Sequence, residues 1–592
     1  MTLCRIELRL SGGFVLSAAL SFALAGFAQE PSPSLKQADA DYRAGVIALS
    51  HNDLKAALAD FEDVVRLAPS AEQGHSALGA VLVRLGRTGA GIRELEKALA
   101  MKPGDGSAQM NLALAYQQSG QAAKALPLFA KLEATAHAEK HPLALSVLVP
   151  YARALAASGQ IPAAIARMKE AAGSDPHNAE LQDELGSLFA QRQDWPSAEE
   201  AFSAALKSNP DFAMAHLHLG LTRKAVQQTG AMEELARAYQ LVPDNALIAT
   251  EYGRALAGAG QDEQAIPVLE HAAKIDPASM AAAYQLGLAL QRANRLDEAI
   301  ALLQKVAAVE PQNAEVLTNL GMALCQVQKA KDAVPILQRA ATLTPENPTA
   351  HQDLAAAFIQ LNQIEDAVEQ LHAALKLSPD APQLHYNLGL ALKMQDDAAG
   401  AIPELEVAAK LDPSAPEPPY VLGVLYMQVG RYVEAAQELN ASLKLRPENG
   451  DGWATLGSVY SKLDKLPEAV SALQEAIRQL PRQPDSHLTL AAVLAKQNQP
   501  AAATEERKKA AELMRANMNR QRAEVATNAA NSKMKSGSVE DAIAQFREAL
   551  SYDANYAEAH AGLANALERQ GKTAEAAEEL RKAADEEKDA PK

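Results

Sequence analysis

Apolar residues in this chain are grouped in short phrases with helical spacing, and proline ends most of these phrases at a regular interval. Alanine, leucine, glycine and tyrosine occupy fixed offsets between the prolines, and charged residues fill the positions between them. In the central part of the chain each proline follows the previous one at the same interval, at Pro277, Pro311, Pro345, Pro379, Pro413, Pro447 and Pro481. Alternation of apolar and polar residues typical of strands is not sustained anywhere. The pattern therefore predicts a repeated pair of helices.

Two columns of small residues run through the repeats. The first precedes the proline by a little over two thirds of the interval, at Gly45, Gly79, Ala152, Gly186, Gly253, Gly287, Gly321, Ala355, Gly389, Gly423 and Gly457. The second is alanine a little over one third of the interval before the proline, at Ala57, Ala164, Ala198, Ala231, Ala265, Ala299, Ala333, Ala367, Ala401, Ala435 and Ala469, with Gly91 as the exception. Antiparallel helices pack closely only where neither presents a bulky side chain. The columns therefore predict where the two helices of each copy cross, with leucine or phenylalanine one helical turn after the alanine filling the adjacent space.

Residues 453–481 show the full pattern, with Trp453, Leu456, Gly457, Tyr460, Ala469, Leu473, Ala476 and Pro481 at fixed offsets. This pattern resembles the tetratricopeptide repeat, a helix–turn–helix unit of about 34 residues. The resemblance covers essentially the whole chain after residue 37 and implies an all-α, right-handed superhelical solenoid. By this template about sixteen copies begin near residues 38, 72, 106, 145, 179, 213, 246, 280, 314, 348, 382, 416, 450, 484, 523 and 557.

The same template divides the chain into segments. A linker is expected at residues 29–37, copies one to three at 38–139, an insertion at 140–144 and copies four to fourteen at 145–517. Between Pro500 and Pro591 there is no proline, so one long helix is expected to fuse copies fourteen and fifteen. Residues 518–589 are assigned to this fused helix and to copies fifteen and sixteen. The last helix is strongly charged, as the outer face of a terminal copy must be.

The N-terminus has the three-part pattern of a secretory signal peptide. Arg5 and Arg9 precede an apolar run that ends in small residues at Gly26 and Ala28. Residues 1–28 are therefore predicted to be a signal peptide, and the mature chain to be exported to the periplasm or secreted. The alternative is an uncleaved N-terminal anchor, because the uncharged run is almost long enough to span a bilayer. No later segment of the sequence is apolar enough to do so.

Charge and cysteine content narrow the range of partners. The 592 residues carry a formal net charge of −17, and removing Arg5, Arg9 and Glu7 with the signal peptide changes this to −18. A surface this acidic works against nonspecific binding to nucleic acid or anionic lipid, so no nucleic-acid partner is expected. Removal of the signal peptide also leaves Cys325 as the single cysteine, which cannot form an intramolecular disulfide.

Motifs for catalysis are missing from the sequence. Thirteen histidines are present, but no HExxH motif or third ligand accompanies His137 and His141, so surface histidines and no metal site are expected. The G-x-G at residues 258–260 lies in a turn inside a helical pair, whereas a phosphate-binding loop follows a strand. No cofactor is expected, and the protein is predicted not to be an enzyme.

In the tetratricopeptide repeat family the first helix of each copy lines a concave groove. Under that resemblance residues 284–427 would present an aromatic and aliphatic stripe at Tyr284, Leu288, Met322, Tyr386, Leu390, Tyr420, Val424 and Met427. Exposed apolar surface of this kind marks binding sites, and the alternative is that these residues pack against the neighbouring helix. Family members that bind acidic chain ends carry lysine and asparagine in the groove, so that activity is not expected here.

A basic stretch stands out in the otherwise acidic chain, at Arg507, Lys508, Lys509, Arg515, Arg520 and Arg522. It could meet an anionic partner. Glutamates are interspersed, however, and mixed charge on a long helix is typical of a solvated face.

Together these features predict a non-enzymatic scaffold of the cell envelope or secreted space that binds a segment of a protein partner in its groove. The alternative is a scaffold for exopolysaccharide synthesis or export, which would contact glycan or the export machinery. Tyrosines in a groove can stack on sugars as readily as on peptides, so the sequence leaves both possibilities open.

Overall fold

The computed structural model describes residues 8–9, 15–16 and 32–589. The predicted signal peptide, residues 1–28, lies outside these residues except for β1 (Leu8–Arg9) and β2 (Val15–Leu16), which form an antiparallel pair. All other regular elements in the described part of the chain are α-helices, which confirms the all-α prediction.

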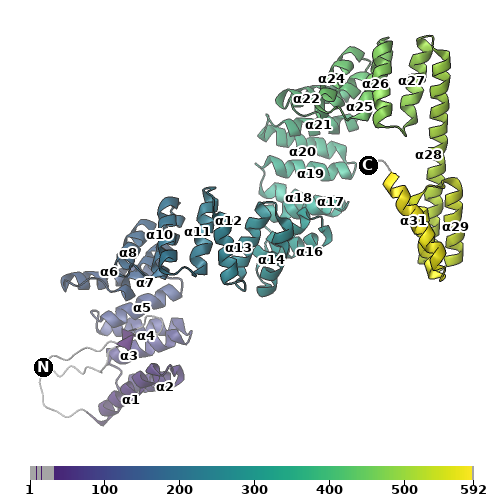
Figure 1. Cartoon of the computed structure of the whole chain (residues 1–592). Helices are drawn as coiled ribbons and strands as arrows, with labels where there is room; N and C mark the ends of the chain where they lie inside the picture. The colour runs from purple at the N-terminus through teal and green to yellow at the C-terminus, as the bar shows by residue number, and fades with distance from the viewer. Residues whose placement is uncertain (1–7, 10–14, 17–31, 590–592) are drawn as a thin grey trace. The chain divides into compact units, whose positions relative to one another are not determined.

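The chain divides into two compact units, Met1–Val309 and Glu310–Lys592, and in each unit successive helices lie side by side in chain order (Figure 1). The helices of the first unit are α1 (Pro33–Ser50), α2 (Leu54–Leu67), α3 (Glu72–Arg84), α4 (Thr88–Met101), α5 (Gly106–Gln118), α6 (Ala122–Ala138), α7 (Leu145–Ala157), α8 (Ile161–Ser174), α9 (Ala179–Gln191), α10 (Trp195–Ser208), α11 (Ala213–Ala225), α12 (Ala231–Leu241), α13 (Ala246–Gly258), α14 (Asp262–Ile275), α15 (Met280–Arg292) and α16 (Leu296–Val309).

The helices of the second unit are α17 (Ala314–Gln326), α18 (Ala330–Leu343), α19 (Pro348–Gln360), α20 (Ile364–Leu377), α21 (Pro382–Met394), α22 (Ala398–Leu411), α23 (Glu417–Gln428), α24 (Tyr432–Leu445), α25 (Gly450–Lys462), α26 (Leu466–Gln479), α27 (Pro484–Lys496), α28 (Pro500–Lys535), α29 (Val539–Tyr552), α30 (Ala557–Arg569) and α31 (Thr573–Asp589). Each first helix packs most extensively on the helix that follows it, so each antiparallel pair corresponds to one copy of the sequence pattern.

The helix boundaries follow the repeat pattern, with one difference at the start. Helix α1 begins at Pro33, so residues 33–37, which the sequence pattern assigned to the linker, are helical. The side chain of Ser32 accepts a hydrogen bond from the backbone N–H of Leu35, and proline is well suited to the first helical turn. Further along, α28 runs without interruption from Pro500 to Lys535 and packs on both α27 and α29 (Figure 1).

The small-residue columns mark the closest approach within each helical pair. A Cβ atom placed on Gly423 would lie 2.5 Å from Cγ of Leu439, and one on Gly45 would lie 2.7 Å from the ring of Phe61. The leucine or phenylalanine of the second helix therefore lies directly on the glycine of the first. Both Phe61 and Leu439 are fully buried, so this contact forms the centre of the core in each copy.

The turn between the two helices of a copy uses a left-handed residue. Asn52 has φ of 58° and Gly86 has φ of 77°, and positive φ recurs at the corresponding turn of later copies. The next residue then bonds back into the helix, as where the N–H of Asp53 donates to the carbonyl of Ala48 at 2.9 Å. This geometry satisfies the free carbonyls at the helix end, and glycine and asparagine adopt it at least cost.

Gly91 departs from the alanine column because its helices approach more closely than alanine would allow. A Cβ atom on Gly91 would lie 2.7 Å from the carbonyl oxygen of Gly79, and one on Gly79 would lie 2.9 Å from the carbonyl oxygen of Gly91. In this copy, backbone faces backbone across α3 and α4. A side chain on either glycine would therefore push the backbones of the two helices apart.

Histidines of the first helices form a recurring junction between copies. In each junction the ring Nε2–H donates to the carbonyl oxygen six residues earlier, where the previous copy ends, and Nδ1 faces a side chain on the copy's own second helix. The five histidines with both contacts are His75, His216, His351, His385 and His560, and their Nδ1 partners are Glu94, Glu234, Gln370, Glu404 and Glu579. We call these contacts the histidine junctions.

The prediction of surface histidines is consistent with His137 and His141, which are exposed, but it is wrong for two of the five junction histidines. His75 and His560 are buried, at 4% and 6% exposure. His487 is also buried and lies 2.5 Å from Glu506 through Nδ1. The sequence pattern concealed this role because the acceptor carboxylates lie on a different helix, far from the histidine along the chain.

Two junction glutamates, Glu94 and Glu579, also accept a hydrogen bond from a lysine one helical turn later, as does Glu506 beside His487. In the last copy His560 Nδ1 and Lys582 Nζ lie 2.5 Å and 2.9 Å from the carboxylate of Glu579. Burial alone would raise the pKa of Glu579, but the hydrogen bonds from Lys582 and His560 outweigh it and lower the pKa below its ordinary value of 4.5. The junction therefore favours the ionised carboxylate.

Because α3 and α4 pack so closely, we expect the alanine that other copies have at the position of Gly91 to destabilise this copy. We expect Gly91→Ala to lower the free energy of unfolding by about 1–2 kcal/mol, because the new methyl group forces two backbones apart. Gly89→Ala, in the same helix with no atom within 4 Å of its added Cβ, is the matched control and is expected to be neutral or stabilising. Urea unfolding followed by circular dichroism measures both. A Gly91→Ala variant as stable as the original chain would contradict this account.

The junction of the last copy predicts a pH-dependent stability. Because the pKa of Glu579 is lower in the folded chain than in the unfolded chain, its stabilisation is complete above pH 4.5 and is lost as the pH falls through the lowered value. We expect Glu579→Gln to destabilise the chain by about 1 kcal/mol at pH 7, with a difference that shrinks in acid. Thermal melts between pH 7 and pH 3 measure it, with the exposed Glu568→Gln as control. A difference that does not change with pH would be evidence against the junction.

Candidate partner-binding surfaces

The predicted groove residues lie on first helices, and most are half-buried rather than freely exposed. In the first unit Tyr284 and Leu288 lie on α15, and both are half-buried. In the second unit Met322 lies on α17 with 37% of its surface exposed. Val424 on α23 is half-buried.

The remaining four stripe residues pack against one hydrophobic cluster of the second unit. Tyr386 and Leu390 on α21, with Tyr420 and Met427 on α23, lie against buried residues that include Leu422 of α23. Packing against neighbouring helices, the alternative named for the stripe, thus accounts for part of their surface. The rest of the surface of these four side chains is exposed, and their role in binding stays a prediction.

The two tyrosines of this group share an environment. Burial raises the pKa of Tyr386, and the nearby carboxylate of Glu417 raises it further, with Arg446 acting in the opposite direction. Burial also raises the pKa of Tyr420, with Asp451 as the next cause. Each hydroxyl therefore stays protonated and remains a hydrogen-bond donor, with an acidic residue of the following copy close by.

Tyr386 also lines a hollow between α21, α22 and α23. This α21–α23 hollow has a volume of about 390 Å³, and Gln383, Asp412 and Glu417 contribute polar groups to its wall. The hollow combines one aromatic ring with several hydrogen-bond acceptors, a composition that suits the binding of a peptide side chain.

A second hollow lies between α19, α20 and α21, with a volume of about 210 Å³. Its wall is mainly apolar, and its lining residues include Ala356, Ile359, Leu371, Leu390 and Met394. Polar groups come from Gln352, Asp353 and Asn387. We call it the α19–α21 hollow. It brings the predicted stripe residue Leu390 together with Asp353, a residue that the sequence pattern did not single out.

Asp353 is the unusual member of this hollow. Its Oδ2 atom is buried and has no hydrogen-bond partner among the described residues. Burial raises the pKa of Asp353 to about 6. The thiol of Cys325 is close enough for Asp353 to raise its pKa, although burial is the larger cause. The sequence does not distinguish Asp353 from the many other acidic residues, because its lack of a partner depends on packing against the neighbouring copies.

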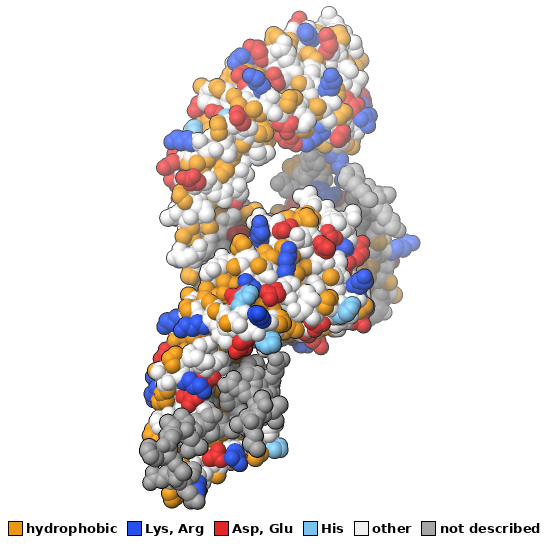
Figure 2. Space-filling model, turned by 90° about the vertical axis from the view of Figure 1, so that its left-hand side faces the viewer, with side chains coloured by type: hydrophobic (Ala, Val, Ile, Leu, Met, Phe, Trp, Pro, Cys, Tyr) orange, Lys and Arg blue, Asp and Glu red, His pale blue; other side chains and the backbone are white. Residues whose placement is uncertain are grey.

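The predicted basic helix is part of α28, where several of its charges already have partners. Lys509 Nζ donates to Glu506 Oε1 at 2.8 Å, and Arg520 lies 3.9 Å from Asp553 and 5.2 Å above the ring of Tyr556. Arg507, Lys508 and Arg515 are exposed. The charges thus behave largely as the mixed-charge interpretation predicts. On the face of the molecule that Figure 2 shows, acidic and basic side chains are likewise interspersed.

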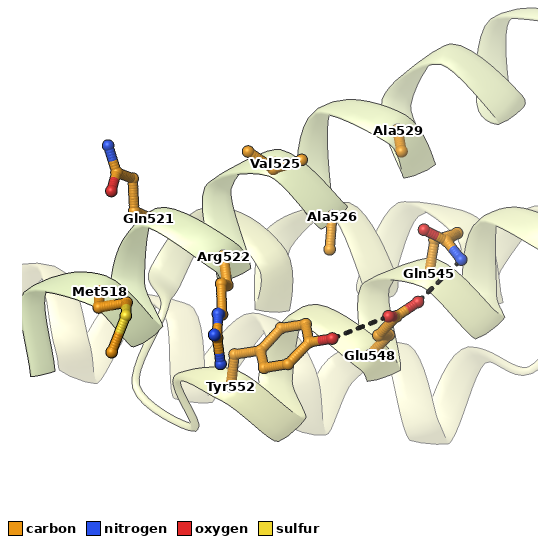
Figure 3. Close-up of a pocket in the computed structure, with 9 residues that line it drawn as sticks. All are labelled: Met518, Gln521, Arg522, Val525, Ala526, Ala529, Gln545, Glu548 and Tyr552. Carbon is orange, nitrogen blue, oxygen red and sulfur yellow. Dashed lines mark hydrogen bonds between the residues drawn. The ribbon is translucent and has the colours of Figure 1, made fainter. Parts of the chain in front are cut away.

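One face of α28 contributes to a third hollow, about 510 Å³ in volume, which it forms with α29 (Figure 3). Met518, Arg522 and Val525 come from α28, while Glu548 and Tyr552 come from α29. The Tyr552 hydroxyl donates to Glu548 at 3.1 Å, and the amide of Gln545 donates to its other carboxylate oxygen at 2.9 Å.

An alanine occupies the histidine-junction position at the α28–α29 hollow. Ala526 lies one full repeat interval before His560, and Gln545 lies the same interval before Glu579. At this position some copies have an imidazole and copy thirteen has the indole of Trp453, whose Nε1–H donates to the carbonyl of Pro447, whereas Ala249 and Ala283 occupy it in copies seven and eight. Copy fifteen has only a methyl group there, and the continuous α28 replaces the turn that would supply the acceptor.

Other types of site are not found in the described residues. No group of three histidine, cysteine, aspartate or glutamate side chains is arranged to hold a metal ion within residues 32–589. None of the described helices has the combination of length and apolar content that crossing a bilayer requires.

Comparison with known families then identifies the repeat. A family model described as a tetratricopeptide repeat matches residues 76–139, 151–211, 184–223, 284–348, 454–512 and 527–591, more than half of the chain. The chain belongs to the tetratricopeptide repeat family. Two further models, described as a TPR repeat and a tetratricopeptide repeat, match residues 357–396 and 392–459. Proteins of this family generally mediate protein–protein interactions, and their repeat fold is typically non-catalytic.

Solved structures that resemble this chain include the APC/C hetero-tetramer Cut9–Hcn1, at 16% identity and a TM-score of 0.39, covering 77% of this chain and 96% of that chain. MamA from Desulfovibrio magneticus RS-1 has 23% identity and a TM-score of 0.28, covering 28% and 96%. YrrB, described as a TPR protein with an unusual peptide-binding site, has 20% identity and a TM-score of 0.29, covering 34% and 99%. All three TM-scores lie below 0.5, so the family assignment rests on the family models. No curated protein matches the sequence.

The raised pKa of Asp353 predicts a stabilising substitution. Between its ordinary pKa of 3.8 and about 6 the folded chain holds the proton more tightly than the unfolded chain, so ionisation above this range costs stability. We expect Asp353→Asn to raise the melting temperature at pH 7.5 by about 1–2 °C and to lose that advantage near pH 4. Differential scanning calorimetry at the two pH values measures it. The exposed Asp366→Asn on α20 is the control, and equal effects of the two substitutions would contradict the prediction.

Proposed function

We propose that this protein is a non-enzymatic scaffold that binds a segment of a partner protein along the first helices of its second unit. The observation that carries the proposal is the grouping around α21. This helix presents Tyr386 to the α21–α23 hollow and Leu390 to the α19–α21 hollow, so two separate hollows open beside one helix. Adjacent apolar pockets with a few polar groups suit an extended or helical peptide that inserts several side chains.

The cellular location is part of the same proposal. The N-terminal pattern of Arg5, Arg9 and the apolar run that ends at Ala28 supports export, and thus a partner in the cell envelope or secreted space. No observation on the described residues favours the exopolysaccharide alternative, so a protein partner is the function we propose.

Substitution of the two tyrosines tests the proposal. Tyr386→Ala with Tyr420→Ala is expected to weaken capture of the partner at least tenfold, because half-buried aromatic residues carry a large share of interface energy. Tyr432→Ala is the matched control, since Tyr432 is also half-buried against the same cluster but lies on α24, a second helix. Circular dichroism verifies that each variant keeps its helices. Unchanged capture by the double variant would refute the groove.

Photo-crosslinking identifies the partner in the same system. A photoreactive amino acid at position 386 of the full chain, in the cells that produce it, is expected to give one discrete adduct that mass spectrometry can name. The same probe at the exposed Lys410 of α22, in the same copy, is the control. Equal adducts from both positions would mean that Tyr386 serves packing alone.

A further inference from the structure

We propose that the α19–α21 hollow binds a lysine side chain of the partner, with the ammonium group beside Asp353 and the aliphatic stem on Ile359, Leu390 and Met394. This inference rests on the proposed function, because it names the chemistry of one side chain that the partner inserts. It assigns to the partner a basic residue, the reverse of the acidic chain ends that other members of the family bind.

The carboxylate of Asp353 lines the hollow and lacks a hydrogen-bond partner for its Oδ2 atom among the described residues. Of the side-chain oxygens and nitrogens that are buried without a hydrogen-bond partner in the described residues, Oδ2 of Asp353 is the one that belongs to a carboxylate. Asp353 as a whole is half-buried, and a carboxylate in such a position is costly without a hydrogen-bonded or charged partner, so such groups are normally paired in folded proteins. The arrangement is reasonable where a ligand supplies the missing partner.

No cation of the chain compensates Asp353. Helices α18, α20 and α21 carry Lys331, Arg339, Lys376 and Lys393, but none of these is a cause of the shift in the pKa of Asp353. Helix α19 and helix α17, which carries the nearby Cys325, contain no lysine or arginine. His351 is the one basic side chain of α19, and it already contacts Gln370 and the carbonyl of Pro345. The raised pKa of Asp353 has burial as its cause, with no compensating charge. The positive charge that would stabilise the ionised group must therefore come from outside the chain.

The shape and the lining of the hollow also fit a lysine side chain. A volume of about 210 Å³ with a mainly apolar wall fits an unbranched aliphatic stem that ends in a polar group. Gln352 lines the same hollow, and its amide oxygen is a second acceptor for an ammonium group with three N–H donors. The amide oxygen of Asn387 already accepts a hydrogen bond from Gln383 at 2.9 Å.

These features favour lysine over the other cations. Arginine prefers a carboxylate that offers both oxygens to two parallel hydrogen bonds. Because Oδ2 of Asp353 is enclosed by the protein, a compact point charge beside the carboxylate suits this site better. A divalent metal ion needs several oxygen ligands, and Asp353 is the single acidic residue in the lining. The net charge of −17 also attracts a basic segment from a distance.

A peptide selection tests the inference with a defined probe. A library of random twelve-residue peptides displayed on phage is selected against the full chain, and bound clones are counter-selected against Asp353→Asn. Enriched clones are expected to share a lysine flanked by apolar residues. Synthetic peptides in which norleucine replaces that lysine, keeping the stem and removing the charge, are expected to bind the original chain at least tenfold more weakly. The same replacement should change binding to Asp353→Asn less than twofold.

Controls separate this inference from the proposed function. Asp366→Asn, exposed on α20, should retain the full preference for lysine. Peptides that lose affinity with Tyr386→Ala and Tyr420→Ala but tolerate norleucine would overturn the lysine site and leave the groove intact. Equal preference for arginine and lysine would also overturn it. A selection without binders, or with binders indifferent to the tyrosines and to Asp353, would count against both.

Discussion

The fold depends on a contact in which a leucine or phenylalanine of one helix lies directly on a glycine or alanine of its partner. Gly45 under Phe61 and Gly423 under Leu439 show the geometry: the space of a single Cβ atom is already occupied. A helix pair that crosses this closely buries its large side chain completely, and each copy contributes such a contact to a core that continues across neighbouring copies. The copy with Gly79 and Gly91 takes the same principle further, since both helices lack side chains at the crossing and the backbones meet.

At the five histidine junctions, hydrogen bonds of a buried or half-buried histidine side chain also join one copy to the next. A ring such as His75 donates to the end of the preceding copy and at the same time meets a carboxylate of its own copy, so one side chain links three segments. Stability in such arrays is a sum of nearest-neighbour contacts. Where α28 replaces a turn with continuous helix, Ala526 takes the place of the ring and a hollow opens beside Tyr552. The long helix and this open surface thus occur at the same place in the array.

The candidate binding surfaces lie where the regular packing of the helices leaves hollows between them. Around α21 the stripe residues are held by core contacts yet keep exposed edges, and rigid aromatic groups of this kind lose little entropy when a partner covers them. Asp353 shows the opposite case, a carboxylate kept in a poorly solvated position without a partner of its own. Binding sites often retain such unfavourable groups, because their cost is recovered only when the ligand is present.

The sequence by itself determined the repeat, the position of each helical pair and the residues at its crossing point, because a constant period with small residues at fixed offsets has one satisfactory packing solution. It placed Tyr386, Leu390 and Tyr420 on one series of helices for the same reason. Only the tertiary structure decided which groups meet across copies. The partner of His75 lies on another helix, the isolation of Asp353 depends on helices before and after it, and Gly91 differs from its column because of Gly79. A periodic pattern indicates which face of a helix is buried. Hydrogen-bond partners, unpaired charges and the exact distance between two helices are set by packing between elements.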